Sequence, residues 1–246
     1  MKRIRLTVAY DGTNYCGFQL QNNGPTIEGE LHTALTAILG HDVKLISASR
    51  TDAGVHSMGN VAVFDTDSRI PAEKFAYALN SHLPADIVVR KTDEVSADWH
   101  PRRQSSRKTY EYRILNAEFP DPLRRLDHYH YHHPLNLTAM QRAAKCLEGT
   151  HDFASFASAH RTVETTVRTL YALSVIQTDD VITIRACGSG FLYNMVRIIA
   201  GTLILAGAGC LDPDAIPGIL TARDRAAAGP TAPAHGLTMI GIEYEE

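Results

Sequence analysis

The first ninety residues carry alternating strand and helix patterns, and their order limits the folds open to the chain. Residues 3–10 alternate apolar and polar side chains with the period of a half-buried strand. A helix is predicted between Thr26, a favoured N-cap residue, and Gly40, which stands just past its end. A second helix is predicted from Pro71, favoured at a first helical position, to about His82. Further strands are predicted near residues 43–49, 60–65 and 87–90.

This order, β-α-β-β-α-β, predicts a split βαβ unit, in which a four-stranded antiparallel sheet carries two helices on one face. The arrangement is ferredoxin-like. It also underlies the RRM, a common RNA-binding module. Because such a fold hosts many activities, it does not assign a function by itself.

The composition changes between residues 97 and 108, where Pro101, Arg102, Arg103 and Arg107 indicate a basic linker. We therefore expect an α+β protein with two subdomains, 1–105 and 106–246, each a mainly antiparallel sheet with helices on one face. The two sheets are expected to join around a central cleft. Beyond the linker, strands are predicted near 108–115, 127–133, 166–177, 181–187 and 237–244, and helices near 138–148, 190–207 and 212–222.

The composition is that of a globular protein, with 246 residues of which 44% are hydrophobic and 21% charged. No secretory signal is visible at the N-terminus, and the longest apolar run, 191–209, carries Asn194 and Arg197, which makes it a poor membrane span. We expect a cytoplasmic protein without membrane association. The four cysteines form no C-x-x-C pair, so neither a disulfide framework nor a zinc site is indicated. Since the net charge is -3, nucleic-acid binding would have to rest on local clusters of cations.

The segment RTDAGVH, residues 50–56, lies between two predicted strands and combines a charge pair, Arg50 and Asp52, with a glycine in one tight bend. A plain turn would explain it, with Asp52 bonding its own backbone and Gly54 taking a positive φ. A reactive carboxylate held in a loop is the alternative. The spacing alone favours the plain turn.

Arg197 stands in an otherwise almost wholly apolar helical pattern, so its guanidinium is expected to be partly or wholly buried. An unpaired buried cation would cost several kcal/mol, which predicts a carboxylate partner. Asp52 is the acid that we expect to pair with it, and this pairing would keep the carboxylate ionised. The alternative is an arginine that reaches the surface along its own stem.

Residues 107–113 have a strand pattern that places Lys108, Tyr110 and Tyr112 on one face. Exposed aromatic side chains beside cations suit base stacking and phosphate contact. Tyrosines packed inward on a half-buried strand are the other interpretation.

Two further patterns have weak functional interpretations. His128, His130 and His132 would face one way on a strand, as metal ligands could, but no acid or cysteine pattern nearby completes a site. Gly188 and Gly190 precede a predicted helix, as in a dinucleotide-binding turn, but the third glycine of that motif is missing. We therefore expect neither a metal site nor a nicotinamide-dependent dehydrogenase.

Five segments occur together and in a fixed order. Taken together they resemble the tRNA pseudouridine synthase A family, and the resemblance runs from end to end of the chain. RTDAGVH is highly specific for this family, and G-x-G-F-L-Y-N-M-V-R is nearly so. The segments are DGTNYCGFQ (11–19), RTDAGVH (50–56), KTY (108–110), GSGFLYNMVR (188–197) and TAPAHGL (231–237).

The resemblance implies an isomerase that converts uridine to pseudouridine in the anticodon stem-loop of tRNA, without metal or organic cofactor. It implies that Asp52 is the essential catalytic aspartate, acting either as a nucleophile or as a base. Tyr110 matches the active-site tyrosine that stacks on the target base, and Arg197 matches the arginine that pairs with the aspartate. Phe191 and Leu192 are expected to wall the pocket.

A uridine stacked in a stem must be flipped out before a side chain can reach it, which costs a few kcal/mol that contacts with the RNA must supply. The resemblance also implies a homodimer. A different class of function remains open, namely a tRNA-binding module or RNA chaperone without chemistry. The residues expected to contact the substrate, besides Tyr110, are Arg50, His56, Phe191, Leu192, Arg102, Arg103, Arg107 and Lys108.

Overall fold

The computed structural model describes residues 1–158 and 164–245. The chain divides into two compact units, one formed by Met1–Ser106 together with Met239–Glu246 and the other by Arg107–Thr238. Residues 239–246 were expected in the C-terminal subdomain, yet their contacts lie in the first unit. The predicted α+β class is confirmed, and the units are described in turn.

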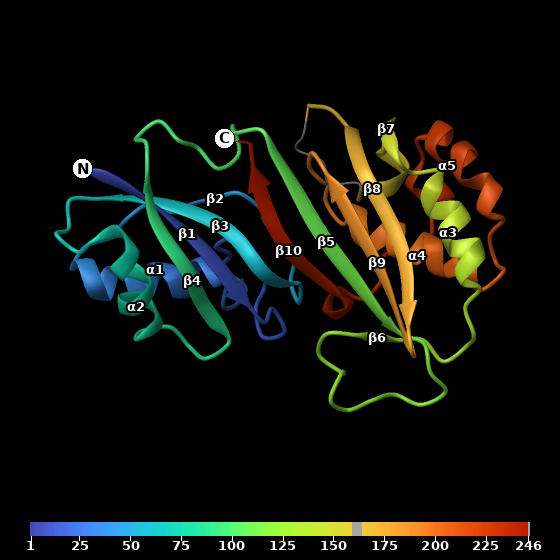
Figure 1. Cartoon of the computed structure of the whole chain (residues 1–246), viewed down its shortest axis with the longest axis horizontal. Coiled ribbons are helices and arrows are strands. Elements are labelled where there is room, and N and C mark those ends of the chain that lie inside the picture. Colours follow the sequence, from blue (N-terminus) through green and yellow to red (C-terminus); the bar gives the residue numbers. More distant parts are fainter. Residues whose placement is uncertain (159–163, 246) are drawn as a thin grey trace. The chain divides into compact units, whose positions relative to one another are not determined.

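The first unit contains a sheet with strand order β4-β1-β3-β10, in which β2 pairs with β3. Strand β1 runs antiparallel to both β3 and β4, and β2 antiparallel to β3. The predicted order β-α-β-β-α-β is confirmed (Figure 1). The elements are β1 (Lys2–Tyr10), α1 (Ile27–Leu39), β2 (Ile46–Ser47), β3 (His56–Thr66), η1 (Ala72–Lys74), α2 (Phe75–Asn80), β4 (Ile87–Val95) and β10 (Leu237–Tyr244).

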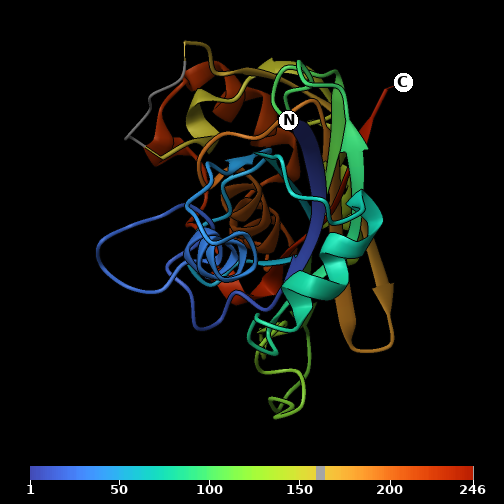
Figure 2. The same cartoon turned by 90° about the vertical axis from the view of Figure 1, so that its left-hand side faces the viewer.

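Both helices of the first unit contribute to one core. Ile4, Leu6 and Val8 of β1 are fully buried on the same face of the sheet, where they join Leu31 of α1 and Phe75 of α2. Figure 2 looks along α1 and shows it beside β1. The alternation in residues 3–10 therefore predicted correctly which face of the first strand is buried.

Helix α1 has the ends that its sequence predicts. The Thr26 hydroxyl accepts a hydrogen bond from the backbone N–H of Gly29 at 3.2 Å, which satisfies one of the free donors of the first turn. At the other end Gly40 has φ 76°, a conformation that glycine adopts without strain, and its N–H donates to the Thr36 carbonyl.

Other boundaries in the first unit differ from the prediction. The strand expected at 43–49 pairs only over Ile46–Ser47, whereas the strand expected at 60–65 begins at His56 and continues to Thr66. The loop that carries Asp52 is therefore shorter than the Arg50–Gly59 loop expected from the sequence.

The segment expected as a basic linker packs against the first unit. Trp99 contacts Tyr244 edge-to-face, with ring centroids 4.9 Å apart, and the Tyr244 hydroxyl donates to the Pro101 carbonyl at 3.1 Å. Ser105 also donates to the Glu245 carboxylate at 2.6 Å. Strand β10 and Glu245, which follows it, thus hold residues 99–105 in place, and the linker prediction is wrong for this part.

The second unit contains a sheet with strand order β5-β9-β8-β7, in which each strand runs antiparallel to its neighbour. Strand β6 pairs in parallel with the end of β5. Its elements are β5 (Ser106–Leu115), β6 (Tyr129–His130), α3 (Leu137–Lys145), β7 (Gly149–Asp152), η2 (Ala154–Phe156), β8 (Val167–Thr178), β9 (Val181–Gly188), α4 (Met195–Gly207), η3 (Pro213–Ala215), α5 (Ile216–Ala222), η4 (Arg225–Ala227) and η5 (Ala234–Gly236).

Helix α4 is the buried centre of the second unit, since nearly all of its residues are buried. The helix begins at Met195 and not near residue 190 as predicted, because Asn194 takes a left-handed conformation with φ 60°. The strand expected at 127–133 is wrong in length, because only Tyr129 and His130 pair. Strand β7 was not predicted.

Candidate active site

Asp52 lies in a tight turn of the first unit, in the loop between β2 and β3. The Val55 N–H donates to the Asp52 carbonyl at 3.1 Å, and Gly54 has φ 75°. The turn and the positive φ predicted from RTDAGVH are thus confirmed. The Asp52 side chain is half-buried, whereas Ala53 at the tip is exposed.

The segment Asp11–Phe18 holds this turn from one side. The Phe18 N–H donates to the Thr51 carbonyl at 3.1 Å, and the Gly54 N–H donates to the Tyr15 carbonyl at 3.3 Å. A Cβ atom on Gly17, whose φ is +97°, would lie 2.7 Å from the Thr51 oxygen. Two of the five family segments, far apart in the sequence, therefore pack directly on one another.

A buried hydrogen-bond network fixes the other side of the loop. Asn60, which is fully buried, donates to the Tyr10 hydroxyl at 3.2 Å and to the Ser49 carbonyl at 3.0 Å. The Tyr10 and Thr51 hydroxyls are 2.7 Å apart, and because Tyr10 accepts from Asn60, its proton is available for Thr51. Sequence reasoning missed this network. The only signal was the amide of Asn60 directly before the apolar run 61–64.

His56, at the start of β3, connects the same loop to the Asp11–Phe18 segment. It is 6% exposed, and its Nδ1 lies 3.1 Å from both the Gly12 N–H and the Asp11 carboxylate. Burial acts to raise the pKa of Asp11, but hydrogen bonds from Thr13 and the nearby His56 outweigh it and hold this pKa below its usual value. His56 was predicted to contact substrate, and the contacts described here tie it to the Asp11 segment.

In the second unit, Tyr110 on β5 contacts Phe191 edge-to-face with ring centroids 5.1 Å apart. Tyr110 is 7% exposed, so its ring packs inward on the strand, and base stacking by Tyr110 stays a prediction. Leu192 is 6% exposed. Its carbonyl accepts a hydrogen bond from the Met195 N–H at 3.0 Å, in the turn before α4. The structure thus brings Tyr110 and Phe191 together in one aromatic contact.

Arg197 is half-buried on α4, as expected, and is held by two acceptors of the second unit. Its Nε donates to the Ala232 carbonyl at 2.7 Å and its Nη1 to the Asn194 side-chain oxygen at 2.9 Å. Asn194 in turn donates to the Ser158 hydroxyl at 2.8 Å. These bonds fix the guanidinium. Its pairing with Asp52 stays a prediction.

The segment TAPAHGL packs along α4 and β5. A Cβ atom on Gly201 would lie 1.9 Å from the oxygen of Pro230, the residue just before this segment, and 3.6 Å from the Ala232 nitrogen within it, so helix and segment are in direct backbone contact. Tyr112, fully buried, donates from its hydroxyl to the Pro233 carbonyl at 2.9 Å. The three family segments of the second unit therefore form one cluster around Tyr110, Tyr112 and Arg197.

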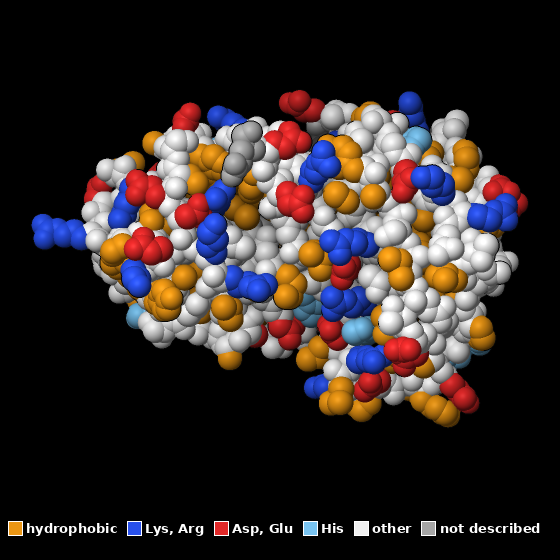
Figure 3. Space-filling model, in the orientation of Figure 1, with side chains coloured by type: hydrophobic (Ala, Val, Ile, Leu, Met, Phe, Trp, Pro, Cys, Tyr) orange, Lys and Arg blue, Asp and Glu red, His pale blue; other side chains and the backbone are white. Residues whose placement is uncertain are grey.

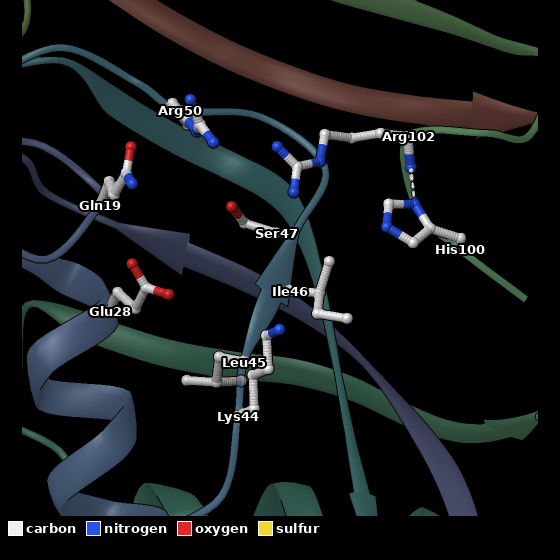
Figure 4. A pocket seen from close by; sticks show the side chains of 9 residues that line it. All are labelled: Gln19, Glu28, Lys44, Leu45, Ile46, Ser47, Arg50, His100 and Arg102. Carbon is white, nitrogen blue, oxygen red and sulfur yellow. Dashed lines mark hydrogen bonds between the residues drawn. The ribbon is translucent and has the colours of Figure 1, made fainter.

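The cations predicted to contact RNA differ in their surroundings. Arg50 and Arg102 line one cavity of the first unit, shown in Figure 4, whereas the exposed Arg103 is not among its lining residues. In the second unit Arg107 lies over the Tyr171 ring, 5.1 Å from its centroid, and Lys108 is half-buried on β5. The sequence did not indicate that Lys44 and His100 share the cavity with Arg50 and Arg102.

The histidines and cysteines have the following surroundings. In the described parts of the chain, no group of three or more His, Cys, Asp or Glu could hold a metal ion. His130 Nε2 hydrogen-bonds the Ala117 carbonyl, and the His132 and His133 rings contact each other at a tilt, with centroids 3.8 Å apart. No described helix is both long and apolar enough to cross a membrane. The cysteines are free thiols, none of them fully buried.

Comparisons with known proteins agree over nearly the whole length. A family model described as tRNA pseudouridine synthase matches residues 6–102 and 143–245. The tRNA pseudouridine synthase A of Acetivibrio thermocellus is 46% identical over 244 residues, 99% of this chain and 100% of the relative. That of Ruminiclostridium cellulolyticum is 46% identical over 245 residues, with the same coverage. That of Brevibacillus brevis is 47% identical over 244 residues, again 99% and 100% of the two chains.

Proposed function

This chain belongs to the tRNA pseudouridine synthase family and is an isomerase that converts uridine to pseudouridine in tRNA, and we propose that Asp52 is its reactive carboxylate. One observation carries the assignment. The half-buried Asp52 occupies a turn that is fixed by the packed Asp11–Phe18 segment and by the buried network of Tyr10, Thr51 and Asn60. Such fixation is what a group needs if it must meet a substrate atom in one geometry.

The reaction breaks the bond between the ribose C1′ and N1 of the base and joins C1′ to C5 instead. The proton on C5 leaves, and N1 takes up a proton, so that the product is an isomer of the substrate without net oxidation. An ionised carboxylate serves both roles open to Asp52, attack as a nucleophile or removal of a sugar proton. Both roles need its position to be fixed.

We assign supporting roles to residues of the second unit. Tyr110 stacks on the target base and assists removal of the C5 proton. Phe191 and Leu192 wall the pocket, and the contact between Tyr110 and Phe191 supports this role because it holds the tyrosine ring in one orientation. Arg197 keeps Asp52 ionised and oriented, and its own two hydrogen bonds support that role by fixing its guanidinium.

We further propose that the target uridines lie in the anticodon arm, that the active form is a homodimer and that the protein works in the cytoplasm. The resemblance of the five segments to the tRNA pseudouridine synthase A family supports these points. Since the target base must leave its stack, contacts with the RNA backbone have to offset the cost of flipping. His56 and the cations Arg50, Arg102, Arg103, Arg107 and Lys108 are our candidates for that work.

The test is the substitution Asp52→Asn, which keeps the size of the side chain and removes its charge. Pseudouridine formation on a tRNA transcript is measured by mass spectrometry, and tRNA binding by fluorescence anisotropy. We expect turnover to fall by at least about a thousandfold, as when other reactive side chains are removed, while binding persists. Asp67→Asn makes the same change at an exposed surface carboxylate and should leave turnover unchanged.

The rival function, tRNA binding without chemistry, has a different outcome. It requires that the unsubstituted chain forms no pseudouridine. It also requires that Asp52→Asn binds tRNA with the same affinity as the unsubstituted chain. Normal product from Asp52→Asn would refute the role of Asp52. Mapping the modified positions on the same transcript tests the anticodon arm, and sedimentation of the protein tests the homodimer.

A further inference from the structure

A cavity of about 200 Å³ lies in the first unit, away from the apolar core. Its walls come from four segments that are distant in the sequence. Figure 4 shows Arg102 reaching toward Ser47 from one side, with Gln19 and Glu28 on the other. The lining residues are Gln19, Glu28, Lys44, Leu45, Ile46, Ser47, Arg50, His100 and Arg102.

Three cations and a single acid, Glu28, line this cavity. Other arginines of the first unit are paired, for example Arg3 with Asp65 at 2.8 Å and Arg5 with Asp93. By contrast, in the part of the chain that the structure describes, Lys44, Arg50 and Arg102 have no carboxylate within salt-bridge distance. Because like charges repel, gathering three of them favours an anionic ligand.

Their convergence is local, since acidic and basic side chains are interspersed on the face seen in Figure 3. The net charge of the whole chain is -3, so no general excess of cations accounts for the cluster. A specific anion site is the simplest physical reason for it.

His100 adds a neutral donor to the cavity. The backbone N–H of Arg102 donates to His100 Nδ1 at 3.2 Å, so this nitrogen carries no proton and the ring proton stands on Nε2. Burial, together with the nearby charges of Arg103 and Arg102, lowers the pKa of His100 and favours the neutral form. The turn is closed by the Arg103 N–H, which donates to the His100 carbonyl at 3.0 Å.

Glu28 is the one acid among the lining residues, and it is already engaged. One of its oxygens accepts from the Leu20 N–H at 2.9 Å, and it stands in the first turn of α1, where a negative charge is favourable. With His100 neutral, three cations against one carboxylate leave the cavity positively charged. The hydroxyl of Ser47 and the amide of Gln19 provide further hydrogen-bond donors.

We propose that this cavity binds a single backbone phosphate of the tRNA, next to the nucleotide on which Asp52 acts. The volume is below the range of about 300 to 1,000 Å³ typical of pockets for whole small molecules, so it suits one charged group better than a nucleoside. Arg50 is two residues from Asp52, and two residues span at most about 7 Å. One wall of the cavity is therefore part of the loop that carries Asp52. This inference rests on the proposed function for the identity of the RNA.

The test uses the full chain with the double substitution Lys44→Gln and Arg102→Gln, both at exposed side chains. Affinity for a tRNA transcript is measured by anisotropy at several salt concentrations. We expect the Kd to rise about tenfold at low salt. The slope of log K against log salt should fall by about 0.7 to 0.9, which is the effect of one lost phosphate contact.

A matched control variant, Lys74→Gln with Lys91→Gln, removes two charges as well, at two exposed lysines of the first unit that do not line the cavity. This control should raise the Kd less than twofold. An equal loss of affinity in the control and in the variant with Lys44→Gln and Arg102→Gln would overturn the proposal, because it would mean that only the net charge of the protein matters.

A second experiment identifies the phosphate. Single phosphates around the target uridine are replaced by neutral methylphosphonates, one at a time. We expect one position to weaken binding to the unsubstituted protein about tenfold and to have no further effect on the double variant. If no position shows this coupling, the cavity does not hold a backbone phosphate. If inorganic phosphate protects Lys44 from acylation but tRNA does not, the site takes a free phosphate and the proposal is wrong.

The two proposals fail differently. Asp52→Asn tests the reaction. If the proposed role of Asp52 is wrong, this variant forms pseudouridine normally and still binds tRNA. The cavity variants test binding. If the phosphate site is wrong, these variants keep the original Kd and salt slope, and the protein still forms pseudouridine.

Discussion

Gly12 lies so close to Val55 that a Cβ atom on Gly12 would be 2.1 Å from the Val55 carbonyl oxygen. This contact joins the segment that follows β1 to the end of the turn that carries Asp52. No side chain fits between the two backbones. The position of Asp52 therefore depends on a residue forty positions earlier in the chain.

Gly12→Ala should displace the turn by several tenths of an ångström or more. The new methyl group would clash with backbone atoms of Val55, which cannot rotate away as a side chain can. We expect the free energy of unfolding to fall by about 1 to 3 kcal/mol, as in other overpacked sites. Turnover should fall by about a hundredfold, the typical effect of a misplacement near 1 Å. Urea denaturation and single-turnover kinetics check the two effects. Gly218→Ala is the control, since no atom lies within 4 Å of its Cβ position, and it should keep full turnover.

Asn194→Gly tests how Arg197 is held. Glycine tolerates the φ of 60° at this position, so the substitution removes the side-chain bonds to Arg197 and Ser158 without backbone strain. We expect turnover to fall about tenfold, which corresponds to about 1.4 kcal/mol in the barrier. Ser158→Ala removes only the bond that does not involve Arg197 and should reduce turnover less than twofold. Equal losses in the two variants would contradict an orienting role for Asn194.

Tyr110→Leu should weaken tRNA binding if the ring stacks on the flipped base. Loss of one base-stacking contact costs about 1 to 3 kcal/mol, so we expect the KM to rise between about fivefold and a hundredfold. Tyr110→Phe keeps the ring and its contact with Phe191, and its KM should stay within about threefold of the original. Tyr77→Leu, at an exposed ring of the first unit, is the control. A normal KM for Tyr110→Leu would exclude stacking.

The ion pair of Arg3 with Asp65 should make the first unit sensitive to acid. Both Asp65 oxygens accept from the guanidinium at 2.8 Å, and these bonds hold the pKa of Asp65 below its usual value. A lowered folded-state pKa contributes stability above the unfolded value near about 4 and loses it as the pH falls through the folded value. Asp65→Asn should therefore flatten the pH dependence of urea denaturation between about pH 5 and 3. Glu94→Gln, at an exposed carboxylate on β4, should leave it unchanged.

Local signals predicted the fold well where a residue's own neighbours decide its structure. Thr26 and Gly40 fixed the ends of α1, and the alternation of residues 3–10 gave the buried face of β1. Strand β7 has no apolar alternation. It exists because residues 149–152 pair with β8, and this contact is not visible in the sequence. The late start of α4 was missed for a similar reason, since the left-handed Asn194 is fixed by Ser158 and Arg197.

The candidate site shows the same division. The five segments named Asp52, Tyr110 and Arg197, but the polar network of Tyr10, Thr51 and Asn60 became visible only when β1 and β3 were paired. The cavity is a stronger case. Lys44 and His100 are more than fifty positions apart, and nothing in the spacing of single cations indicates that they share a wall with Arg102.

The place of β10 has a consequence for how the protein is made. Residues 239–246 complete the first unit, while residues 107–238 form the second. On the ribosome, the second unit has all of its strands and helices before the first receives the strand beside β3 and the Tyr244 side chain that holds Trp99 and Pro101. The unit that is synthesised first is thus the one that is finished last. Until residues 239–245 are made, the nascent chain exposes the part of the β3 edge that β2 does not cover, and it lacks the support for the turn that bears Arg102.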